Sequence, residues 1–533
     1  MNARKALHQF GYRRSPDQDR HDAHHPAIVV GAGPVGLCAA IDIAQRGIPV
    51  LLLDDSDRIG EGSRGICYAK RTLEILDRLG VGEPCIAKGV TWKIGKVFQA
   101  DRLLYEFDLL PEYGHKRPAF INLQQYYLER FLVERAAGIP NLEIRWRNTV
   151  SGVAPLNDGV RLTIDTPDGP YVLRADWVVA ADGARSTIRR LLALDFRGEA
   201  FEDRFLIADV RMTGDFPPER WFWFDPPFHD GRSALMHKQP DDLWRIDLQL
   251  GRNADPKAEQ RPERVLPRLK AMLGHDRFAL EWVSVYTFQC RRLERFVHGR
   301  VLFAGDAAHQ VSPFGARGGN SGIQDAENLA WKLAAVIRGE ARPSLLVSYH
   351  VERSAAADEN IGHSTRSTDF IAPRSPQELR FRDAALSLAR ETGFGKRMVN
   401  SGRLSTASTY RNSPLSTPDA DAWAGTAALG APLPDAPLRD ARGRDAWLLD
   451  ALGGETTLLV APNGPPMPAP AGLPRLVVGA DLLDATGHLA RRLDLTRGAA
   501  LLVRPDQHLA ARWRRPGPGA VEAALDRLRG ASP

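Results

Sequence analysis

The sequence predicts an α/β protein with a Rossmann-like nucleotide-binding domain, an inserted β-sheet domain and a C-terminal α/β domain. Residues 27–54 follow the order strand, glycine-rich turn, helix, strand. Two further strand-and-turn units come much later, at 177–183 and 300–306, and short alternating strands fill 195–290 between them. At 533 residues the chain is too long for one compact core, which also favours several domains.

The first glycine-rich turn, GAGPVG, directly follows the apolar strand 27–30. Gly31 permits the tight turn, Gly33 lets the backbone approach a diphosphate, and Gly36 lets the helix pack on the strand. The free N–H groups and positive dipole end of that helix suit a diphosphate. Asp54 ends the next strand, where an acidic residue binds ribose hydroxyls. The pattern predicts a dinucleotide site and leaves the choice between FAD and NAD open.

Two later strands each bring an aspartate to the carboxyl edge of the predicted sheet, where ligands of α/β folds bind. Asp182 either faces the ligand or caps the helix that follows. Asp306 is placed to bond polyol or ribityl hydroxyls. The Pro- and Gly-rich loop 313–320 opens a helix whose N-terminus would stabilise the negative charge of a reduced flavin ring. His309 is either catalytic or, as we favour, a packed structural histidine.

The composition excludes several classes of function. The net charge of +6, from 71 basic and 65 acidic residues, is spread along the chain without the basic stripe of a nucleic-acid-binding protein. No apolar run of about 18 residues is present, and the polar residues 1–25 lack a signal-peptide core, so we expect no membrane segment and a disordered tail there. The four cysteines have no CxxC or metal-ligand spacing, which predicts reduced thiols, a cytoplasmic protein and no metal site: Cys38, Cys67, Cys85 and Cys290.

In this order, the three motifs resemble the class A flavoprotein monooxygenases, the p-hydroxybenzoate hydroxylase-like group. The segment GDAAHQVSPFGARGGNSGIQDAENLAWKL is similar to the 3-(3-hydroxyphenyl)propionate and phenol hydroxylase branch. The resemblance covers about residues 27–370 and implies FAD, NADH or NADPH as co-substrate, and O2. It also implies that a phenolic substrate, such as a hydroxylated aromatic acid, is hydroxylated through a flavin C4a-hydroperoxide. Whether the chain forms a homodimer stays open.

The resemblance divides the chain into domains. It implies an FAD-binding domain in two parts, 26–194 and 291–372, around a β-rich substrate-binding domain at 195–290. A helical segment and linker at 373–420 follow. Residues 421–533 resemble the thioredoxin-like tail of the phenol hydroxylase branch, although they contain no cysteine.

The resemblance also carries cofactor roles to matching positions. Gln125, four residues before Glu129, matches a glutamine that contacts the cofactor, and Gln124 is the alternative if the match shifts by one. Arg64 matches an arginine near the flavin and the diphosphate, and Arg245 one that touches the flavin from the substrate sheet. The full set of expected cofactor-binding residues is Gly31, Gly33, Gly36, Asp54, Arg64, Gln125, Asp182, Arg245, Asp306, Pro313, Gly318, Gly319 and Asn320.

Activation of a phenol requires a base or hydrogen-bond acceptor on the substrate sheet. The candidates for catalysis are His237, Asp247 and Tyr286, and those for substrate contact are His237, Gln239 and Trp223. An anionic substituent of the ring would favour an arginine partner, and the sequence leaves Arg232 and Arg292 equally open.

Three other functions compete with phenol hydroxylation. A related flavoprotein could oxidise or epoxidise a non-phenolic substrate. The stretch WFWFDP, residues 221–226, is similar to the WxWxIP motif of flavin-dependent halogenases, although aromatic residues alternating along a half-buried strand explain it without chemistry. A non-enzymatic flavin-binding protein is disfavoured because the loop-to-helix N-terminus would then have no purpose.

Overall fold

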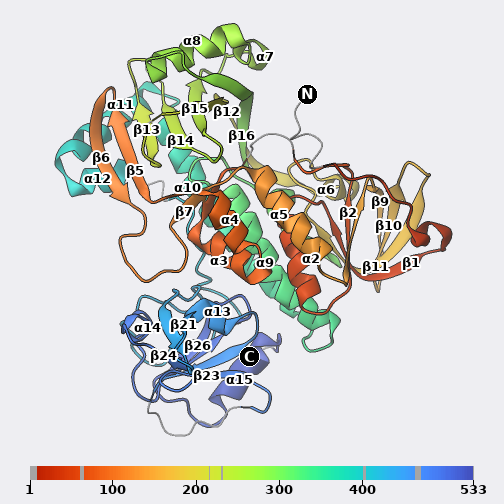
Figure 1. The fold of residues 1–533 in the computed structure, drawn as a ribbon. Helices are drawn as coiled ribbons and strands as arrows, with labels where there is room; N and C mark the ends of the chain where they lie inside the picture. The colour runs from red at the N-terminus through yellow and green to blue at the C-terminus, as the bar shows by residue number, and fades with distance from the viewer. Residues whose placement is uncertain are drawn as a thin grey trace.

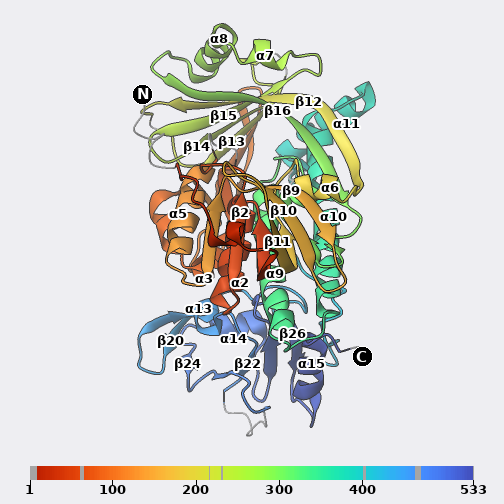
Figure 2. The same ribbon diagram turned by 90° about the vertical axis from the view of Figure 1, so that its right-hand side faces the viewer.

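A computed structural model describes residues 9–60, 65–214, 216–229, 232–399, 404–462 and 470–531. The chain forms three parts, and Figures 1 and 2 both show the C-terminal part at the opposite end of the molecule from the sheet that carries α7 and α8. The central part is an α/β domain, as predicted. None of the helices within these ranges is long and apolar enough to cross a membrane.

The central sheet brings the predicted motifs to one edge. Strands β1, β2, β8, β11 and β18 run parallel, in the order β18-β11-β1-β2-β8, so their carboxyl ends lie together. Helices α2 and α9 pack against each other beside this sheet. The bounds are β1 Ala23–Val30, β2 Val50–Asp54, β8 Leu142–Trp146, β9 Thr149–Pro155, β10 Val160–Asp165, β11 Tyr171–Ala180, β17 Val297–His298, β18 Val301–Phe303, α2 Pro34–Gln45, α5 Gln125–Ala137, α6 Thr187–Leu191 and α9 Gly318–Ile337.

Residues 9–25 are folded, which corrects the disordered tail predicted over 1–25 for that stretch, whereas residues 1–8 lie outside the described residues. Strand β1 already pairs with β11 at Ala23, and a short 3-10 helix, η1 Pro16–Asp19, precedes it. The buried carboxylate of Asp17 accepts from Arg145 at 2.6 Å and lies 2.8 Å from His25 Nε2. Composition alone suggested a solvated polar segment, but its charges find partners on the β8 edge of the sheet.

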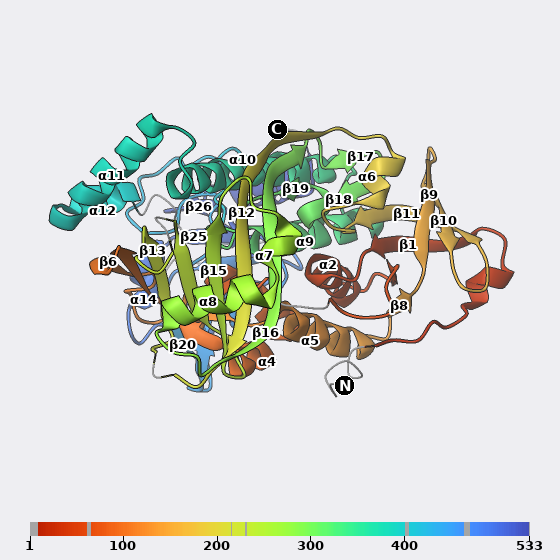
Figure 3. The same cartoon turned by 90° about the horizontal axis from the view of Figure 1, so that it is seen from above.

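The second sheet has eight strands in the order β19-β16-β12-β15-β14-β13-β5-β6. Two of them, β5 and β6, come from residues 94–108, which the sequence analysis assigned to the FAD-binding part, so the substrate domain is not confined to 195–290. Figure 3 shows α8 lying across the outer face. The bounds are β5 Ile94–Gln99, β6 Arg102–Asp108, β12 Phe196–Arg211, β13 Arg220–Phe224, β14 Ala234–Lys238, β15 Leu243–Leu250, β16 Ala279–Leu293, β19 His309–Gln310, α7 Pro256–Glu259 and α8 Pro262–Leu273.

A small antiparallel sheet, β3-β7-β4, and several helices join the central and second sheets. The long helix α10 runs along α9, and α11 and α12 pack against each other near strand β6. The bounds are β3 Cys67–Ala69, β4 Val90–Trp92, β7 Phe120–Asn122, α3 Lys70–Leu79, α4 Gly82–Lys88, η2 Gly305–Ala307, α10 Leu345–Ile371, α11 Pro376–Glu391 and α12 Gly393–Val399.

The C-terminal unit has its own apolar core and is docked on the central domain. Its main sheet has the order β23-β22-β25-β26, with one parallel pair, β22 and β23, and antiparallel pairs elsewhere. Trp331 of α9 and Leu345 of α10 share a buried cluster with this unit. The bounds are β20 Pro437–Asp440, β21 Asp445–Trp447, β22 Thr457–Val460, β23 Arg475–Val477, β24 Leu482–Leu483, β25 Ala500–Val503, β26 Leu509–Trp513, α13 Leu448–Leu452, α14 His488–Leu493 and α15 Ala520–Leu528.

Candidate functional site

The glycine-rich turn has the shape that a diphosphate requires. Gly31 has φ +104°, and a Cβ there would lie 2.4 Å from the carbonyl oxygen of Ala181. A Cβ on Gly36 would lie 1.8 Å from the carbonyl oxygen of Gly31, so helix α2 needs a glycine there. Gly33 faces open space, with no atom within 4 Å of its would-be Cβ. The first and third glycines thus permit close packing, and the second leaves room for a ligand.

Asp54 lies beside this turn at the end of β2. Its carboxylate accepts from the backbone N–H of Ala32 at 2.5 Å and of Ser56 at 2.8 Å. Burial raises the pKa of Asp54 to about 6, so the group is ionised at neutral pH and retains acceptor capacity for ribose hydroxyls.

Asp182 and Asp306 complete the same edge. Asp182 Oδ2 accepts from the N–H of Ile188 at 3.0 Å, whereas its Oδ1 is buried and, among the described residues, has no hydrogen-bond partner. The geometry of Asp182 is therefore compatible with both predicted roles, as a helix cap through Oδ2 and as a ligand contact through Oδ1. Asp306 keeps an exposed side chain, yet desolvation by the surrounding protein raises the pKa of its carboxyl. The two carboxylates are suited to accept hydrogen bonds from a polar cofactor bound at this edge of the sheet.

The turn that carries Asp306 is held from below by a buried ionic cluster. Asp325 of α9 accepts from the N–H of Gly305 at 2.9 Å and lies 2.7 Å from His309 Nε2. Its other oxygen accepts from Arg353 Nε at 2.6 Å. His309 is buried in this cluster and stacks on Phe296, which agrees with a structural role.

The N-terminus of α9 faces the same site with little side-chain cover. Its N-cap, Arg317, makes no capping hydrogen bond, and a Cβ on Gly319 would meet nothing within 4 Å. Pro313 and Gly319 are exposed, and Gly318 is half-buried. The side chain of Asn320 is fully engaged, because it accepts from Ala69 N–H and donates to Cys67 O, so only its backbone could face a flavin.

Gln125 contacts Gly65, next to residues 61–64, and the predicted Arg64 lies outside the described residues. Its Oε1 accepts from the N–H of Gly65 at 3.1 Å, and its Nε2 donates to Glu129 at 2.7 Å. Glu129 accepts in turn from Gly60 N–H at 2.6 Å. Gln124 donates to the carbonyl of Pro240 instead. Of the two glutamines, Gln125 is therefore the one that contacts the residues flanking Arg64.

On the second sheet, strand register lines up a row of polar side chains on the inner face. Arg220 pairs with His237, His237 with Arg245, and Arg245 with Asp209, across strands β13, β14, β15 and β12. Asp247 lies two residues beyond Arg245 on the same face of β15.

Arg245 is neutralised within this row. Its Nε and Nη2 donate to the two oxygens of Asp209 at 2.9 and 3.1 Å, and all of these groups are buried. Gln239 also donates to Asp209, at 2.9 Å. The positions expected to contact the flavin and the substrate, Arg245 and Gln239, therefore share one carboxylate and stiffen the sheet.

Unlike Arg245 and Gln239, Asp247 and His237 each have a buried polar atom without a hydrogen-bond partner among the described residues. Burial raises the pKa of Asp247 to about 6, although Arg245 counteracts the shift, and its Oδ1 has no hydrogen-bond partner among the described residues. Desolvation lowers the pKa of His237 well below its usual value, so this imidazole is neutral. Tyr286 lies on β16, which pairs with β12, and is opposite Phe205 of that strand. It packs at the edge of a buried, mainly aromatic cluster.

An aromatic cavity opens beside this row. Phe314 and Gly315 of the loop before α9 line it, so it adjoins the expected flavin position. Its other lining residues include Val97, Tyr105, Phe107, Arg220, Phe222, Phe224, Ser367, Phe370, Ile371, Val399 and Leu404.

The predicted substrate contact Trp223 is wrong, because that side chain is on the outer face of the sheet. It packs there with Phe98, Met236 and Trp244 under α8. The alternation of β13 turns Arg220, Phe222 and Phe224 inward instead. These three residues are not among the candidates predicted from the sequence, although the period of two along residues 220–224 indicates that they share a face. The outward tryptophans also explain the halogenase-like stretch as core packing.

The two arginines left open by the sequence do not reach the cavity. Arg292 forms an ion pair with Asp358 at 2.5 Å, and Arg232 has an exposed side chain next to Gly251.

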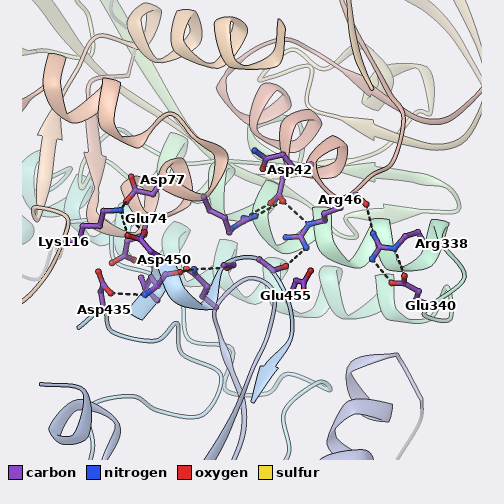
Figure 4. A pocket seen from close by; sticks show the side chains of 16 residues that line it. Asp42, Arg46, Glu74, Asp77, Lys116, Arg338, Glu340, Asp435, Asp450 and Glu455 are labelled. Atoms are coloured by element: carbon purple, nitrogen blue, oxygen red, sulfur yellow. Dashed lines mark hydrogen bonds and ion pairs between the residues drawn. The ribbon is translucent and has the colours of Figure 1, made fainter. Parts of the chain in front are cut away.

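A larger cavity lies at the far end of α2, between the central domain and the C-terminal unit (Figure 4). Opposite charges line it and are paired, Arg46 with Asp42 at 3.0 Å, Arg338 with Glu340 at 2.7 Å and Lys116 with Asp450 at 2.8 Å. It contains none of the carboxylates of the glycine-turn edge, so we assign it to the domain interface.

The glycine turn, its carboxylates, the open helix terminus and the adjoining aromatic cavity are the features of a dinucleotide-dependent oxidoreductase. Residues 24–364 match the family model described as "FAD binding domain", and the chain belongs to this family. It is an FAD-dependent aromatic-ring monooxygenase of the branch that the motifs indicated.

Known proteins support this assignment. The chain is 32% identical to 6-methylpretetramide 4-monooxygenase of Streptomyces rimosus over 530 residues, 94% of this chain and 93% of that protein. It is 27% identical to 3-(3-hydroxy-phenyl)propionate/3-hydroxycinnamic acid hydroxylase of Mycobacterium sp. (strain JLS), over 91% of this chain and 82% of the relative. The solved structure of the flavin-dependent monooxygenase PieE has the same fold, with a TM-score of 0.81 at 24% identity over 96% of this chain and 99% of PieE.

Proposed function

We propose that this enzyme hydroxylates a phenolic aromatic compound, with NADH or NADPH as the reductant and O2 as the oxygen source. The observation that carries the proposal is Asp247, a half-buried residue whose carboxyl has a pKa of about 6 and a buried Oδ1 with no hydrogen-bond partner among the described residues. It lies on the inner face of the sheet whose strand β13 lines the aromatic cavity. A base of that pKa is matched to taking a proton from a phenol near neutral pH.

Once reduced, the bound FAD would activate O2 for transfer to the ring. Gly31, Gly33 and Gly36 would hold its diphosphate, Asp54 its ribose, and Asp306 its ribityl chain. The N-terminus of α9 would stabilise negative charge on the ring system. Arg64, Asp182, Gln125 and the backbone from Pro313 to Asn320 remain proposed contacts.

Asp247 is the proposed base, and His237 the proposed neutral hydrogen-bond partner beside it. Removing the phenolic proton makes the ring carbon electron-rich at the moment of oxygen transfer. Phe222, Phe224 and Phe314 would exclude water and hold the ring plane. Tyr286 lies further along the sheet and is a second candidate for substrate contact.

The substrate is proposed only by class. One relative is named for 3-(3-hydroxy-phenyl)propionate, a hydroxylated aromatic acid, and another for 6-methylpretetramide. The first of these names supports a hydroxylated aromatic acid as the proposed substrate class.

We also propose a thioredoxin-like fold for residues 421–533. The strand order β23-β22-β25-β26, with a parallel pair followed by two antiparallel pairings and the terminal helix α15, supports this. These residues contain no cysteine, so the proposed role is structural. Single-component use of the nicotinamide, a cytoplasmic location and a possible dimer remain expectations.

A screen of NADH and NADPH oxidation against phenols tests the proposed reaction. The expected result is substrate-stimulated oxidation and, by mass spectrometry, a product heavier by one oxygen. Consumption that yields only hydrogen peroxide with every phenol would refute the substrate class. A chloride-dependent product would instead indicate a halogenase.

A further inference from the structure

One cationic side chain that lines the aromatic cavity, Arg220, has no anionic partner among the described residues. Arg220 begins strand β13, and its guanidinium lies over the face of Phe222, 5.7 Å from the ring centroid. Within the described ranges, no ion pair or hydrogen bond engages its guanidinium. Arg220 is half-buried at the cavity wall with no anion beside it, and a partly desolvated guanidinium favours a bound anion.

The neighbours of Arg220 do not supply that anion. Glu219, the preceding residue, pairs with Lys96 at 2.8 Å and accepts from Trp221 Nε1. Across the strands, register places Gly95 on one side of Arg220 and the neutral His237 on the other. The acidic Asp209 is already committed to Arg245.

Asp247 is the remaining carboxylate on this face. It lies on β15, two strands from Arg220 and two residues further along, roughly 10 Å or more between backbones. The two groups influence each other electrostatically, yet they form no ion pair within 4.0 Å among the described contacts. Asp247 is therefore not the anionic partner of Arg220, and it does not line the cavity.

Tyr105, on β6, adds a second donor to the same cavity. Its side chain is buried, lines the cavity beside Arg220, and has no hydrogen-bond partner among the residues described. Ser367, the third polar lining residue, already donates to the carbonyl of His363 at 2.9 Å. The free polar groups of the cavity wall are thus donors, and no acidic side chain lines it.

We propose that Arg220, assisted by Tyr105, binds an acidic oxygen of the aromatic substrate and so selects anionic over neutral aromatic compounds. The oxygen belongs to a ring carboxylate or to an ionised phenol, since both accept charge-assisted hydrogen bonds from a guanidinium. The inference rests on the proposed function, because it takes the aromatic cavity as the substrate site. It also gives the substrate two polar ends, one at Arg220 and one at Asp247.

Binding to the oxidised holoenzyme, followed through the perturbed flavin absorbance, tests this without turnover. Two ligand pairs separate the two sources of charge: 3-(3-hydroxyphenyl)propionate with its methyl ester, and 4-nitrophenol with 4-nitroanisole. The wild type is expected to favour the anionic member of at least one pair. Arg220→Met should weaken binding of that member about 10- to 100-fold and change the neutral member by no more than about twofold.

Three further variants calibrate the measurement. Arg220→Lys keeps the charge without the planar fork and should lie between wild type and Arg220→Met. Tyr105→Phe should cost about 2- to 10-fold for the anionic member only. Arg292→Met is the matched control, because that arginine lies on the same sheet and is already paired with Asp358, and it should bind both members as wild type does.

Three results would overturn the inference: equal affinity of wild type for both members of both pairs, equal losses for both members in Arg220→Met, or no binding of any of the four probes. The proposed function is judged separately, by product mass. If the wild type oxygenates acids and neutral phenols alike and Arg220→Met retains both activities, the anion site is refuted and phenol hydroxylation stands. If binding discriminates as expected but no phenol gains oxygen, the anion site stands and the proposed reaction falls.

Discussion

Arg504 of the C-terminal unit and Glu352 of helix α10 form a two-pronged ion pair, with N–O distances of 2.6 and 2.9 Å, and both side chains are fully buried. Lys332 donates to the same carboxylate at 2.6 Å. Although burial alone would raise it, these cations hold the pKa of Glu352 well below its usual value. The next residue, Arg353, donates to Asp325, which accepts from the backbone of the turn that carries Asp306. Adjacent residues of helix α10 therefore contact the C-terminal unit and support the candidate cofactor site.

Glu352→Gln should therefore destabilise the whole protein, not one surface. Removing this carboxylate leaves the buried Lys332 without its acidic partner and Arg504 with Asp506 alone, a loss on the order of 3–5 kcal/mol. The apparent Tm should fall clearly below that of Glu340→Gln, which removes one partner of an exposed pair. The lowered pKa means that this stabilisation is present above about pH 4.5 and is lost as pH falls. Equal Tm values for the two variants would contradict the role of the pair.

Alanine at two glycines of the turn should have different effects. Gly36→Ala places a Cβ against the Gly31 carbonyl, so the protein should fold poorly or not at all. Gly33→Ala meets no atom and should keep the fold while weakening FAD binding, because the methyl group occupies ligand space. Circular dichroism and the ratio of flavin to protein distinguish the two. Full flavin content in Gly33→Ala would argue against the diphosphate at this turn.

Asp306→Ala should weaken FAD retention by about 10- to 100-fold, because a carboxylate that accepts from polyol hydroxyls is removed. The measurement is the flavin-to-protein ratio after gel filtration and a fluorescence titration with FAD. Asp358→Ala, which removes the surface partner of Arg292, is the control and should retain the cofactor. Recovery of Asp306→Ala with stoichiometric FAD would refute the ribityl contact.

Asp247→Asn should lower kcat by about 10²- to 10⁴-fold with the flavin still bound. Wild-type kcat should fall as pH drops below about 6, when Asp247 takes a proton, and the variant should lose this dependence. A raised carboxyl pKa has the opposite consequence for stability, which is greatest at low pH and declines as pH rises from about 4 to about 6. The variant should therefore gain Tm over wild type at pH 7.5 and show little difference near pH 4. An unchanged pH profile would remove Asp247 as the base.

The cofactor edge could be predicted from the sequence because parallel strands end together. Once a strand precedes each of Gly31, Asp182 and Asp306, the three motifs must meet at one edge of a parallel sheet. The roles of the glycines follow from backbone geometry, which local sequence largely determines. His309 could likewise be assigned a structural role from its place inside a strand-and-turn motif.

The substrate side could not be predicted to the same depth, because it depends on pairing between distant strands. Whether Trp223 or Phe222 faces inward is decided by register, and a shift of one residue reverses every side chain. That Arg245 is neutralised by Asp209 depends on the pairing of β12 with β15, 36 residues apart. The free Arg220 becomes visible only when its neighbours on β5 and β14 are known.

Strands β5 and β6 have a consequence for engineering. A graft of residues 195–290 from a relative would bring Arg220 and Phe222 but leave the native Tyr105 and Val97 facing them. The binding wall is thus encoded in two stretches separated by the whole strand-rich run from β7 to β11, and a chimera that exchanges one stretch alone would join two halves selected for different ligands. Altered specificity in this scaffold requires that residues 94–108 be exchanged together with the later strands.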